Sequence, residues 1–463
     1  MPAERESIEA RDIEHLIHPY TNLVVHREKG PFVLERGEGI YVWDRAGRRY
    51  IEGLAGLWCT ALGFGEEALA RAAFDQMKRL PYYHLFGGKS QGPAVELAEK
   101  LKEIAPFPAS KVFFVNSGSE ANDTLIKLVW YINNALGRPQ KKKIISRRRA
   151  YHGVTIAAGS LTGLPFAQQD FDLPIPGILH TDCPHYYREA RPGETEEDFA
   201  DRLAQNLENL ILDQGPETVA AFIAEPVMGA GGVIVPPRTY FEKVQAILKR
   251  YDILFLDDEV ICGFGRTGNL FGCQTYDFTP DAMTVAKALS SAYLPVGAVL
   301  IPESMYDALL DESRKLGTFG HGFTYSGHPV CAAVALRNIQ LMEERRILDH
   351  VRLVSGRFQE RLASLGRHPL VGETRGVGLV GGCELVADKE TRRPFEPARA
   401  VGAFCAERAL SHGLITRNLG DTLAFCPPLI ITEEEIDDLF DRFERALEET
   451  ERWVEEKGLT ETQ

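Results

Sequence analysis

The chain has 463 residues, enough for two or three domains around a large core. Hydrophobic residues make up 44% of it and charged residues 25%, which is ordinary for a soluble globular protein. The formal net charge of -14 argues against a general nucleic-acid binder, and no uncharged apolar stretch is long enough to span a membrane.

The expected elements, taken in chain order, form a central α/β region between two flanking parts. Residues 39–51 alternate apolar and polar positions around an Asp-Arg-Ala-Gly turn and predict a β-hairpin. From residue 112 onward, short apolar runs alternate with helical patterns, which predicts a mostly parallel sheet covered by helices. The strands are expected over residues 112–115, 144–145, 219–224, 253–256 and 296–301. The last element is an amphipathic helix that begins after Thr432.

The same pattern predicts the domain organisation. We expect a large domain over residues 70–325 and a smaller domain assembled from residues 1–69 and 326–463. No internal repeat or low-complexity linker suggests another division of the chain.

The cysteines and the N-terminus indicate the compartment. The eight cysteines form no Cys-x-x-Cys pair and no Cys/His metal spacing. We therefore expect free thiols in a reducing compartment, and neither disulfides nor a metal site. Residues 1–6 lack the basic-then-apolar layout of a signal peptide, so the expected location is cytoplasmic.

An acid and a lysine in the central region suggest cofactor chemistry. Residues 253–260 form an apolar run that ends in carboxylates, including Asp258, at the kind of strand end where α/β proteins bind ligands. Lys287 follows a short apolar stretch and precedes small residues, which predicts a position in a pocket. A pyridoxal phosphate (PLP) enzyme needs this pair, because the lysine forms the Schiff base and the acid keeps the pyridine nitrogen protonated. On these two residues alone, a structural ion pair is an equally good explanation.

Other polar residues also follow predicted strands. Residues 116–122 lie between a strand and a helix and favour a phosphate, although a capped helix start has the same sequence pattern. Tyr151 could lie flat on a cofactor ring or simply pack in the core. Glu225 ends another strand. Several such strand ends at one edge of a sheet are difficult to explain as core packing.

Two later segments leave a functional and a structural interpretation open. Thr324, in a glycine- and aromatic-rich segment, could donate a hydrogen bond to phosphate or belong to a turn. Arg417 ends an apolar run, where it could bind a carboxylate with its guanidinium fork or form a surface ion pair.

Residues 263–268 match G-x-G-x-x-G by letter, which raises a nucleotide-binding oxidoreductase as an alternative. The context is wrong for that motif, because it does not lead straight off a strand and no helical pattern follows it. The glycines are better explained as a loop beside the active centre.

Taken together, these motifs resemble the class III (omega) aminotransferases of the PLP fold type I superfamily, over nearly the whole chain. Residues 18–21, 57–59 and 414–417 resemble the omega-amino acid or amine:pyruvate branch. The resemblance implies an α/β fold whose large domain has a mostly parallel seven-stranded sheet covered by helices, beside a smaller α+β domain from both termini. It also implies PLP as the cofactor and a homodimer or higher even-numbered oligomer.

The implied reaction transfers an amino group from a primary amine or omega-amino acid to pyruvate, by ping-pong transfer through pyridoxamine phosphate. Lys287 would be the Schiff-base lysine and proton carrier, and Asp258 would pair with the pyridinium nitrogen. The other implied cofactor-binding residues are Ser117, Gly118, Ser119, Tyr151, His152, Glu225, Val260 and, from the neighbouring subunit, Thr324. The implied substrate-binding residues are Tyr20, Trp58, Arg417 and, from the partner chain, Phe86.

One departure from the family narrows the substrate. Ornithine- and GABA-type members carry an acid five positions after the Glu of the Glu-Pro motif, where it can hold the arginine back. Here that position is Ala230, so we expect a less restrained Arg417 and no ornithine or GABA specialist. A lyase, mutase or racemase on the same scaffold remains an alternative.

Overall fold

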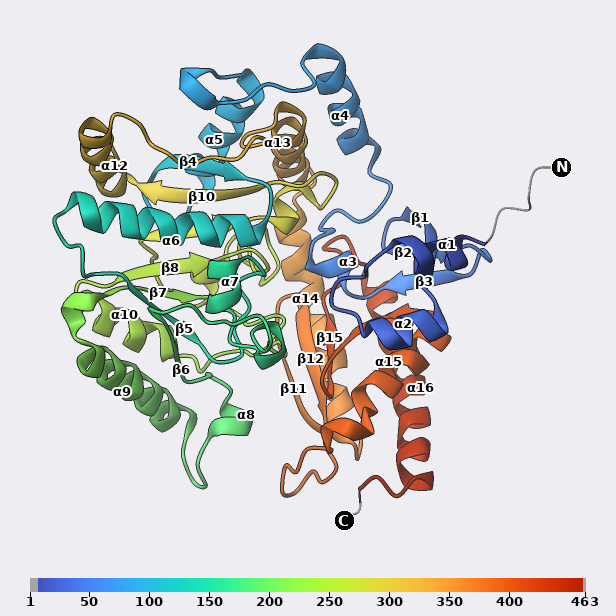
Figure 1. Ribbon diagram of the computed structural model, residues 1–463. Helices are drawn as coiled ribbons and strands as arrows, with labels where there is room; N and C mark the ends of the chain where they lie inside the picture. The colour runs from blue at the N-terminus through green and yellow to red at the C-terminus, as the bar shows by residue number, and fades with distance from the viewer. Residues whose placement is uncertain (1–6, 461–463) are drawn as a thin grey trace.

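The computed structural model describes residues 7–460 (Figure 1), so the expectation about residues 1–6 lies outside it. At its centre is a seven-stranded sheet with the strand order β4-β10-β9-β8-β7-β5-β6. Its strands are β4 (Ala109–Val115), β5 (Lys143–Arg147), β6 (Ile178–Thr181), β7 (Val219–Ala224), β8 (Leu254–Asp258), β9 (Ala282–Val285) and β10 (Gly297–Pro302). β10 runs antiparallel to both of its neighbours, and all other pairs are parallel. The expected mostly parallel, seven-stranded sheet is confirmed.

Helices cover both faces of this sheet. In β7, Ala221 and Ile223 pack with one hydrophobic cluster, and Phe222 and Ala224 pack with another, because successive side chains of a strand point to opposite faces. The first cluster includes side chains of α6 (Gly118–Ala135), α7 (Ile156–Leu161) and α12 (Glu303–Leu316). The second includes side chains of α5 (Gly92–Ile104), α9 (Glu196–Gln214), α10 (Tyr240–Arg250) and α13 (Pro329–Glu344).

The two ends of the chain meet in a separate four-stranded sheet. It has the order β1-β2-β3-β13, and β13 (Leu414–Ile415) pairs in parallel with β3 (Arg49–Glu52). β1 (Leu34–Glu38) and β2 (Tyr41–Asp44) complete it, and β2 and β3 form the expected hairpin. In Figure 1 the blue N-terminal strands accordingly lie beside the red C-terminal elements. This pairing supports a smaller domain from residues 1–69 and 326–463 beside residues 70–325, a division that stays a prediction.

The C-terminal part adds a third sheet and the closing helices. The sheet order is β11-β12-β15-β14. The elements of this part are α14 (Ile347–Ser364), β11 (Val371–Val377), β12 (Val380–Leu385), α15 (Val401–Ser411), β14 (Arg417–Leu419), β15 (Thr422–Phe425) and α16 (Glu433–Glu456). Thr432 caps α16 as expected, with Glu435 completing a reciprocal capping box.

The remaining helices belong to the first third of the chain and to short connections. They are α1 (Ile8–His15), α2 (Leu23–Lys29), α3 (Ala55–Trp58), α4 (Glu67–Arg79), α8 (Tyr186–Glu189), α11 (Gly272–Thr275) and the 3-10 turns at Phe86–Gly88, Pro165–Ala167, Pro216–Thr218, Lys287–Ser290, Leu365–Arg367 and Pro397–Arg399. None of the helices between residues 7 and 460 combines the length and apolarity that a membrane crossing requires. All eight cysteines are unpaired, as expected.

The glycine motif of residues 263–268 forms a loop, as the sequence suggests. It is followed by the four-residue helix α11, too short to supply the helix of a dinucleotide-binding unit. Within the loop, Nη1 of Arg266 donates to the backbone carbonyls of Leu379 (3.0 Å) and Pro427 (2.6 Å). The loop therefore ties the central sheet to the C-terminal part.

Candidate active site

A cavity of about 1870 Å³ lies where the carboxyl ends of the central strands face the terminal segments of the chain. Most of the residues that the sequence singles out line it. They are Tyr20, Trp58, Ser117, Gly118, Ser119, Tyr151, His152, Glu225, Asp258, Val260, Lys287 and Arg417. Phe86 and Thr324 are not among the lining residues.

Asp258, the last residue of β8, is held by a buried hydrogen-bond network. Its Oδ2 accepts from Nδ2 of Asn122 (2.8 Å) and from Nδ1 of His152 (2.7 Å), and its Oδ1 accepts from the backbone N–H of Val260 (3.1 Å). Asn122 is itself fixed, because its Oδ1 accepts from the hydroxyl of Thr284 at 2.9 Å. Strand β8 thus delivers a carboxylate whose orientation is set from three sides.

Asn122 and Thr284 are functional residues that the sequence analysis missed. Asn122 is in the quoted motif but received no role, and Thr284 lies in β9, a strand that was not predicted. Both side chains are almost completely buried. A buried amide in the otherwise apolar stretch of α6 is a signal that could have identified Asn122, because such groups require hydrogen-bond partners.

Lys287 lies two residues beyond the end of β9, after Ala286. Its φ of 47° falls in the left-handed region that residues other than glycine rarely adopt, and such conformations concentrate at functional sites. Burial lowers the pKa of Lys287, while the nearby Asp258 and Glu225 carboxylates act in the opposite direction. Among residues 7–460, no side chain forms a hydrogen bond or ion pair with its Nζ, which leaves this amine available for reaction.

Glu225 fixes the turn that carries Tyr151. Its two oxygens accept from the backbone N–H groups of Tyr151 (2.9 Å) and Gly229 (3.2 Å), and burial raises the pKa of its carboxyl group. Burial also raises the pKa of the Tyr151 hydroxyl, and a hydrogen bond with Tyr20 adds to this effect. The Tyr20 and Tyr151 rings meet edge-on, with centroids 6.3 Å apart.

The N-terminus of α6 opens into the same cavity. Oγ of Ser117 caps the helix by accepting from the N–H of Glu120 (3.1 Å), and Oγ of Ser119 accepts from the N–H of Val154 (3.1 Å). A Cβ on Gly118 would lie 2.9 Å from Cγ1 of Val260, so only glycine fits between the helix start and that side chain. The arrangement suits a phosphate, because the free N–H groups of a helix start favour an anion.

The opposite wall of the cavity comes from the terminal segments. Tyr20 and Trp58 both have positive φ, 51° and 65°. Arg417 begins β14 and lines the cavity together with Ala230. Phe166, which no sequence argument singled out, also lines it and packs edge-on against Tyr20, with centroids 6.0 Å apart.

Phe86 and Thr324 both lie outside the cavity and are exposed. The Phe86 side chain is 50% exposed and packs against Gly322, where a Cβ would come within 2.9 Å of the ring. The backbone carbonyl of Thr324 accepts from the hydroxyl of Tyr82 at 2.8 Å. The expected roles of Phe86 and Thr324 in the partner's site remain predictions.

The lining residues fit PLP. Nε2 of His152 is buried without a hydrogen-bond partner among residues 7–460, so one polar atom beside Asp258 is left for a group that the cavity would hold. The cavity also combines a free lysine, a buried carboxylate and a helix start, which are the chemical groups that bind the aldehyde, the ring nitrogen and the phosphate of PLP.

Comparisons with known proteins identify the family. The aminotransferase class-III model matches residues 24–447. Gamma aminobutyrate transaminase 3, chloroplastic, of Solanum lycopersicum is 53% identical over 444 residues, covering 95% of this chain and 85% of the relative. Gamma-aminobutyrate transaminase 1, mitochondrial, of Oryza sativa subsp. indica is also 53% identical, covering 95% and 86%.

Solved structures agree with this match. The omega transaminase from Pseudomonas jessenii in complex with PMP is 55% identical and has a TM-score of 0.96, covering 97% of this chain and 99% of that one. A thermostable omega transaminase variant engineered for asymmetric synthesis of enantiopure bulky amines is 55% identical, with a TM-score of 0.95 and coverage of 97% and 100%.

The gamma-aminobutyrate transaminases of Solanum lycopersicum and Oryza sativa contradict the expected cytoplasmic location, because their names place them in the chloroplast or the mitochondrion. The expectation was wrong for a physical reason. Free thiols indicate a reducing environment, and that property does not distinguish the cytoplasm from the interior of an organelle.

The family match covers most of the chain, and the cavity presents the groups that its cofactor needs. The family match also favours amino-group transfer over the lyase, mutase, racemase and oxidoreductase alternatives. The chain therefore belongs to the class III aminotransferases and is a PLP-dependent transaminase.

Proposed function

We propose that this transaminase moves the amino group of a primary amine or omega-amino acid to pyruvate. The observation that carries the proposal is the position of Arg417 and the lack of an ion-pair partner for its guanidinium in the described chain. It lines the cavity, and among residues 7–460 no carboxylate pairs with its guanidinium. A guanidinium in a partly apolar cavity is a ready partner for a substrate carboxylate, which it can bind with two parallel hydrogen bonds.

Ala230 supports this role for Arg417. It lines the same cavity at the position where a relative with an acid could hold the arginine in place. A methyl group cannot form that ion pair. Arg417 is therefore free to bind the carboxylate of pyruvate in one half-reaction and to turn away from an uncharged amine in the other.

The side chains that follow the strands of the central sheet would carry the chemistry. When bound, PLP supplies the electron sink and carries the amino group. Nζ of Lys287 binds the cofactor and moves the proton, a task for which its lowered pKa suits it. Asp258 holds the ring nitrogen protonated, and Asn122 and His152 keep that carboxylate oriented.

The remaining lining residues would hold the cofactor in place. Ser117, Gly118 and Ser119 would bind its phosphate at the start of α6, while Tyr151 and Val260 would pack against its ring. Glu225 acts through the backbone of Tyr151, which it fixes by a hydrogen bond. Tyr20 and Trp58 would contact the substrate.

We also propose that the enzyme works as a homodimer or a higher even-numbered assembly. Phe86 and Thr324 do not line this chain's cavity, although they resemble pocket and phosphate-binding residues. Both are exposed, which suits delivery to a second copy. Sedimentation of the active enzyme tests this point, and a fully active monomer would contradict it.

A matched pair of donors tests the substrate proposal. 4-Aminobutyrate and n-butylamine differ only in the terminal carboxylate, and each is assayed with pyruvate and with 2-oxoglutarate. We expect pyruvate to be the better acceptor with both donors, because the second carboxylate of 2-oxoglutarate would be buried beside Trp58 and Phe166. Equal or better turnover with 2-oxoglutarate would contradict pyruvate as the acceptor.

The names of the relatives make 4-aminobutyrate a necessary member of that donor panel. Several relatives that are 51–53% identical are named gamma-aminobutyrate transaminases. The expectation that Ala230 disfavours a GABA specialist therefore stays a prediction. This prediction requires that the enzyme accept n-butylamine at a rate comparable to that of 4-aminobutyrate.

A further inference from the structure

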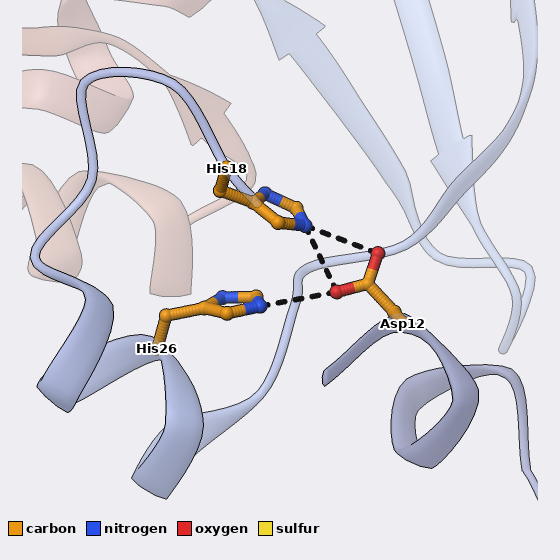
Figure 2. Close-up of side chains that lie close together, drawn as sticks. All are labelled: Asp12, His18 and His26. Atoms are coloured by element: carbon orange, nitrogen blue, oxygen red, sulfur yellow. Dashed lines mark hydrogen bonds and ion pairs between the residues drawn. The ribbon is translucent and has the colours of Figure 1, made fainter. Parts of the chain in front are cut away.

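Three side chains near the N-terminus converge on one point outside the substrate cavity (Figure 2). Asp12 comes from α1, His26 from α2, and His18 from the turn between them. Nε2 of His18 lies 2.9 Å from Oδ1 of Asp12, and Nε2 of His26 lies 3.1 Å from the same oxygen. The two imidazole rings lie with their centroids 4.0 Å apart and are tilted by 32°.

The geometry of these atoms suits a metal ion. One ligand atom from each side chain lies within 4.8 Å of the others. Around a tetrahedral zinc ion with bonds of about 2.0–2.2 Å, neighbouring ligand atoms lie about 3.3–3.6 Å apart, so each imidazole nitrogen would have to move from Oδ1 of Asp12 by only about half an ångström. For an ion to enter, both imidazoles must carry their proton on Nδ1, so that the two Nε2 atoms are free to act as ligands.

The cluster is also free and accessible. Among residues 7–460, none of the three side chains forms an ion pair with a residue outside the cluster. Their exposed fractions are 15% for Asp12, 30% for His18 and 9% for His26, so solvent reaches the site although the ligand atoms are partly shielded. A shielded carboxylate with two imidazoles is the mixed nitrogen and oxygen set that borderline metal ions prefer.

Two other groups of possible ligands in the described chain lack these properties. In the first, Arg375 already pairs with both acids, so a metal ion would compete with a guanidinium; its members are His185, Glu373 and Glu384. The second is fully buried and has no route for an ion; its members are Asp257, Glu259 and Cys273.

We propose that Asp12, His18 and His26 bind a divalent transition-metal ion of the Zn²⁺ type, with water in the remaining coordination positions. The ion would cross-link α1, α2 and the turn between them. That turn carries Tyr20, two residues after His18, which lines the substrate cavity and contacts Tyr151. The site would therefore be structural and would fix one wall of the active site.

The sequence predicted no metal site, because it contains no Cys-x-x-Cys pair and no Cys/His spacing typical of metal ligands. The ligands here are separated by six and eight positions and come from three different segments. Their convergence depends on how α1 and α2 pack, which spacing does not reveal.

Equilibrium dialysis of the PLP-loaded enzyme against Zn²⁺ tests the proposal. The wild type is expected to bind one equivalent per chain at this site. His26→Gln and Asp12→Asn should each weaken it by more than about 100-fold, because loss of a second-shell partner alone costs about 10–100-fold. His15→Gln is the matched control, since His15 lies on α1 outside the cluster and should bind like the wild type.

Two further measurements keep the result unambiguous. The cofactor absorbance of each variant shows that it has folded and loaded PLP. With Co²⁺ in place of Zn²⁺, an absorption spectrum without thiolate charge-transfer bands is expected, which excludes binding at a free cysteine. Failure of the wild type to bind Zn²⁺, binding that survives both substitutions, or thiolate bands in the Co²⁺ spectrum would overturn the proposal.

Discussion

The two walls of the cavity are built in opposite ways. The wall formed by the central sheet ends in polar groups that already satisfy one another, as Asn122, His152 and the Val260 backbone do around Asp258. The wall formed by the terminal segments carries Tyr20, which is half exposed, and Arg417, which no carboxylate among residues 7–460 neutralises.

This difference matches what each wall must do. A cofactor that stays bound needs groups held in one orientation, and the buried hydrogen bonds around Asp258 provide that. Two chemically different substrates that share one cavity need a wall that can accept a charge in one half-reaction and none in the other. The terminal wall has Arg417 for this purpose, a cation that pairs with no carboxylate among residues 7–460.

The strongest test of the central wall is Lys287→Ala. We expect turnover to be lost altogether, because no other lysine lines the cavity and no other amine can hold the cofactor and move the proton. Amine-dependent alanine formation from pyruvate measures this. Lys315→Ala, an exposed position on α12, is the control and should behave as the wild type. Substantial activity in the Lys287 variant would remove this residue from the mechanism.

Asp258→Asn tests the carboxylate of the same wall. A neutral amide cannot hold the ring nitrogen protonated, so the rate should fall by more than about 100-fold while the cofactor still binds. Single-turnover kinetics of the half-reaction with an amine measure this. A fall of less than about tenfold, equivalent to ~1.4 kcal/mol of barrier, would contradict the pairing.

Asp257→Asn is the matched control for that variant. Asp257 precedes Asp258 on β8 and lies on the opposite face of the sheet, beside Glu259. Burial raises the pKa of Asp257 well above its usual range, and the neighbouring Glu259 adds to this. Asp257 does not line the cavity, and an amide has nearly the same shape as its carboxyl group, so this substitution should change the rate little.

The sequence predicted the central wall well for a physical reason. Parallel strands place their carboxyl ends at one edge, so the polar residues that follow them, such as Tyr151, Glu225 and Asp258, had to lie together. The strand pattern was visible because buried strands are continuous apolar runs. Strands β6 and β9 of the central sheet were not predicted, because each has only four residues and no long apolar run.

The sequence could not predict features that depend on packing between distant segments. Thr284 supports Asn122 only because β9 lies next to β8 in the sheet, an order that strand patterns do not reveal. The same holds for Phe166, which reaches the cavity from a short connection. For the terminal wall, the family resemblance supplied Tyr20 and Trp58, since periodicity gave no reason to single them out.

Arg417→Ala tests the terminal wall. The kcat/KM measured with pyruvate and with 4-aminobutyrate should fall by about 100-fold. The reason is that loss of a charged hydrogen bond between the guanidinium and the substrate carboxylate costs roughly 2–3 kcal/mol. The half-reaction of n-butylamine, which has no carboxylate, should change little. Cofactor absorbance separates the two half-reactions. An equal loss for both donors would mean that Arg417 supports the fold and does not bind substrate.

Ala230→Glu tests the same role of Arg417 by adding a carboxylate to the cavity. The new carboxylate would lie in the cavity with Arg417 and could pair with it, so carboxylate-bearing substrates should bind more weakly while n-butylamine is spared. Ala230→Gln is the control, since it adds the same bulk without the charge. Similar effects of both substitutions would point to steric obstruction in place of charge pairing.

The smallest expected effect concerns the support of the terminal wall. Glu52, buried at the end of β3, accepts a hydrogen bond from the N–H of Gly56, in the segment that carries Trp58. Burial raises its pKa from 4.5 to about 7, and the hydrogen bonds from Gly56 and Leu54 only partly oppose this. The folded protein therefore holds this proton more tightly than the unfolded chain does.

That shift makes stability depend on pH in a defined direction. Because the folded pKa is raised, the stabilisation from protonated Glu52 is fully present below pH 4.5 and is lost as the pH rises through about 7. The loss is at most roughly 3 kcal/mol, from 1.36 kcal/mol per pKa unit. Glu52→Gln keeps a neutral side chain at every pH, so its melting temperature should exceed that of the wild type increasingly between pH 5 and 8. Glu38→Gln, exposed on β1 of the same sheet, should give a constant difference. Parallel profiles for the wild type and the Glu52 variant would mean that the support of the terminal wall does not depend on the ionisation of Glu52.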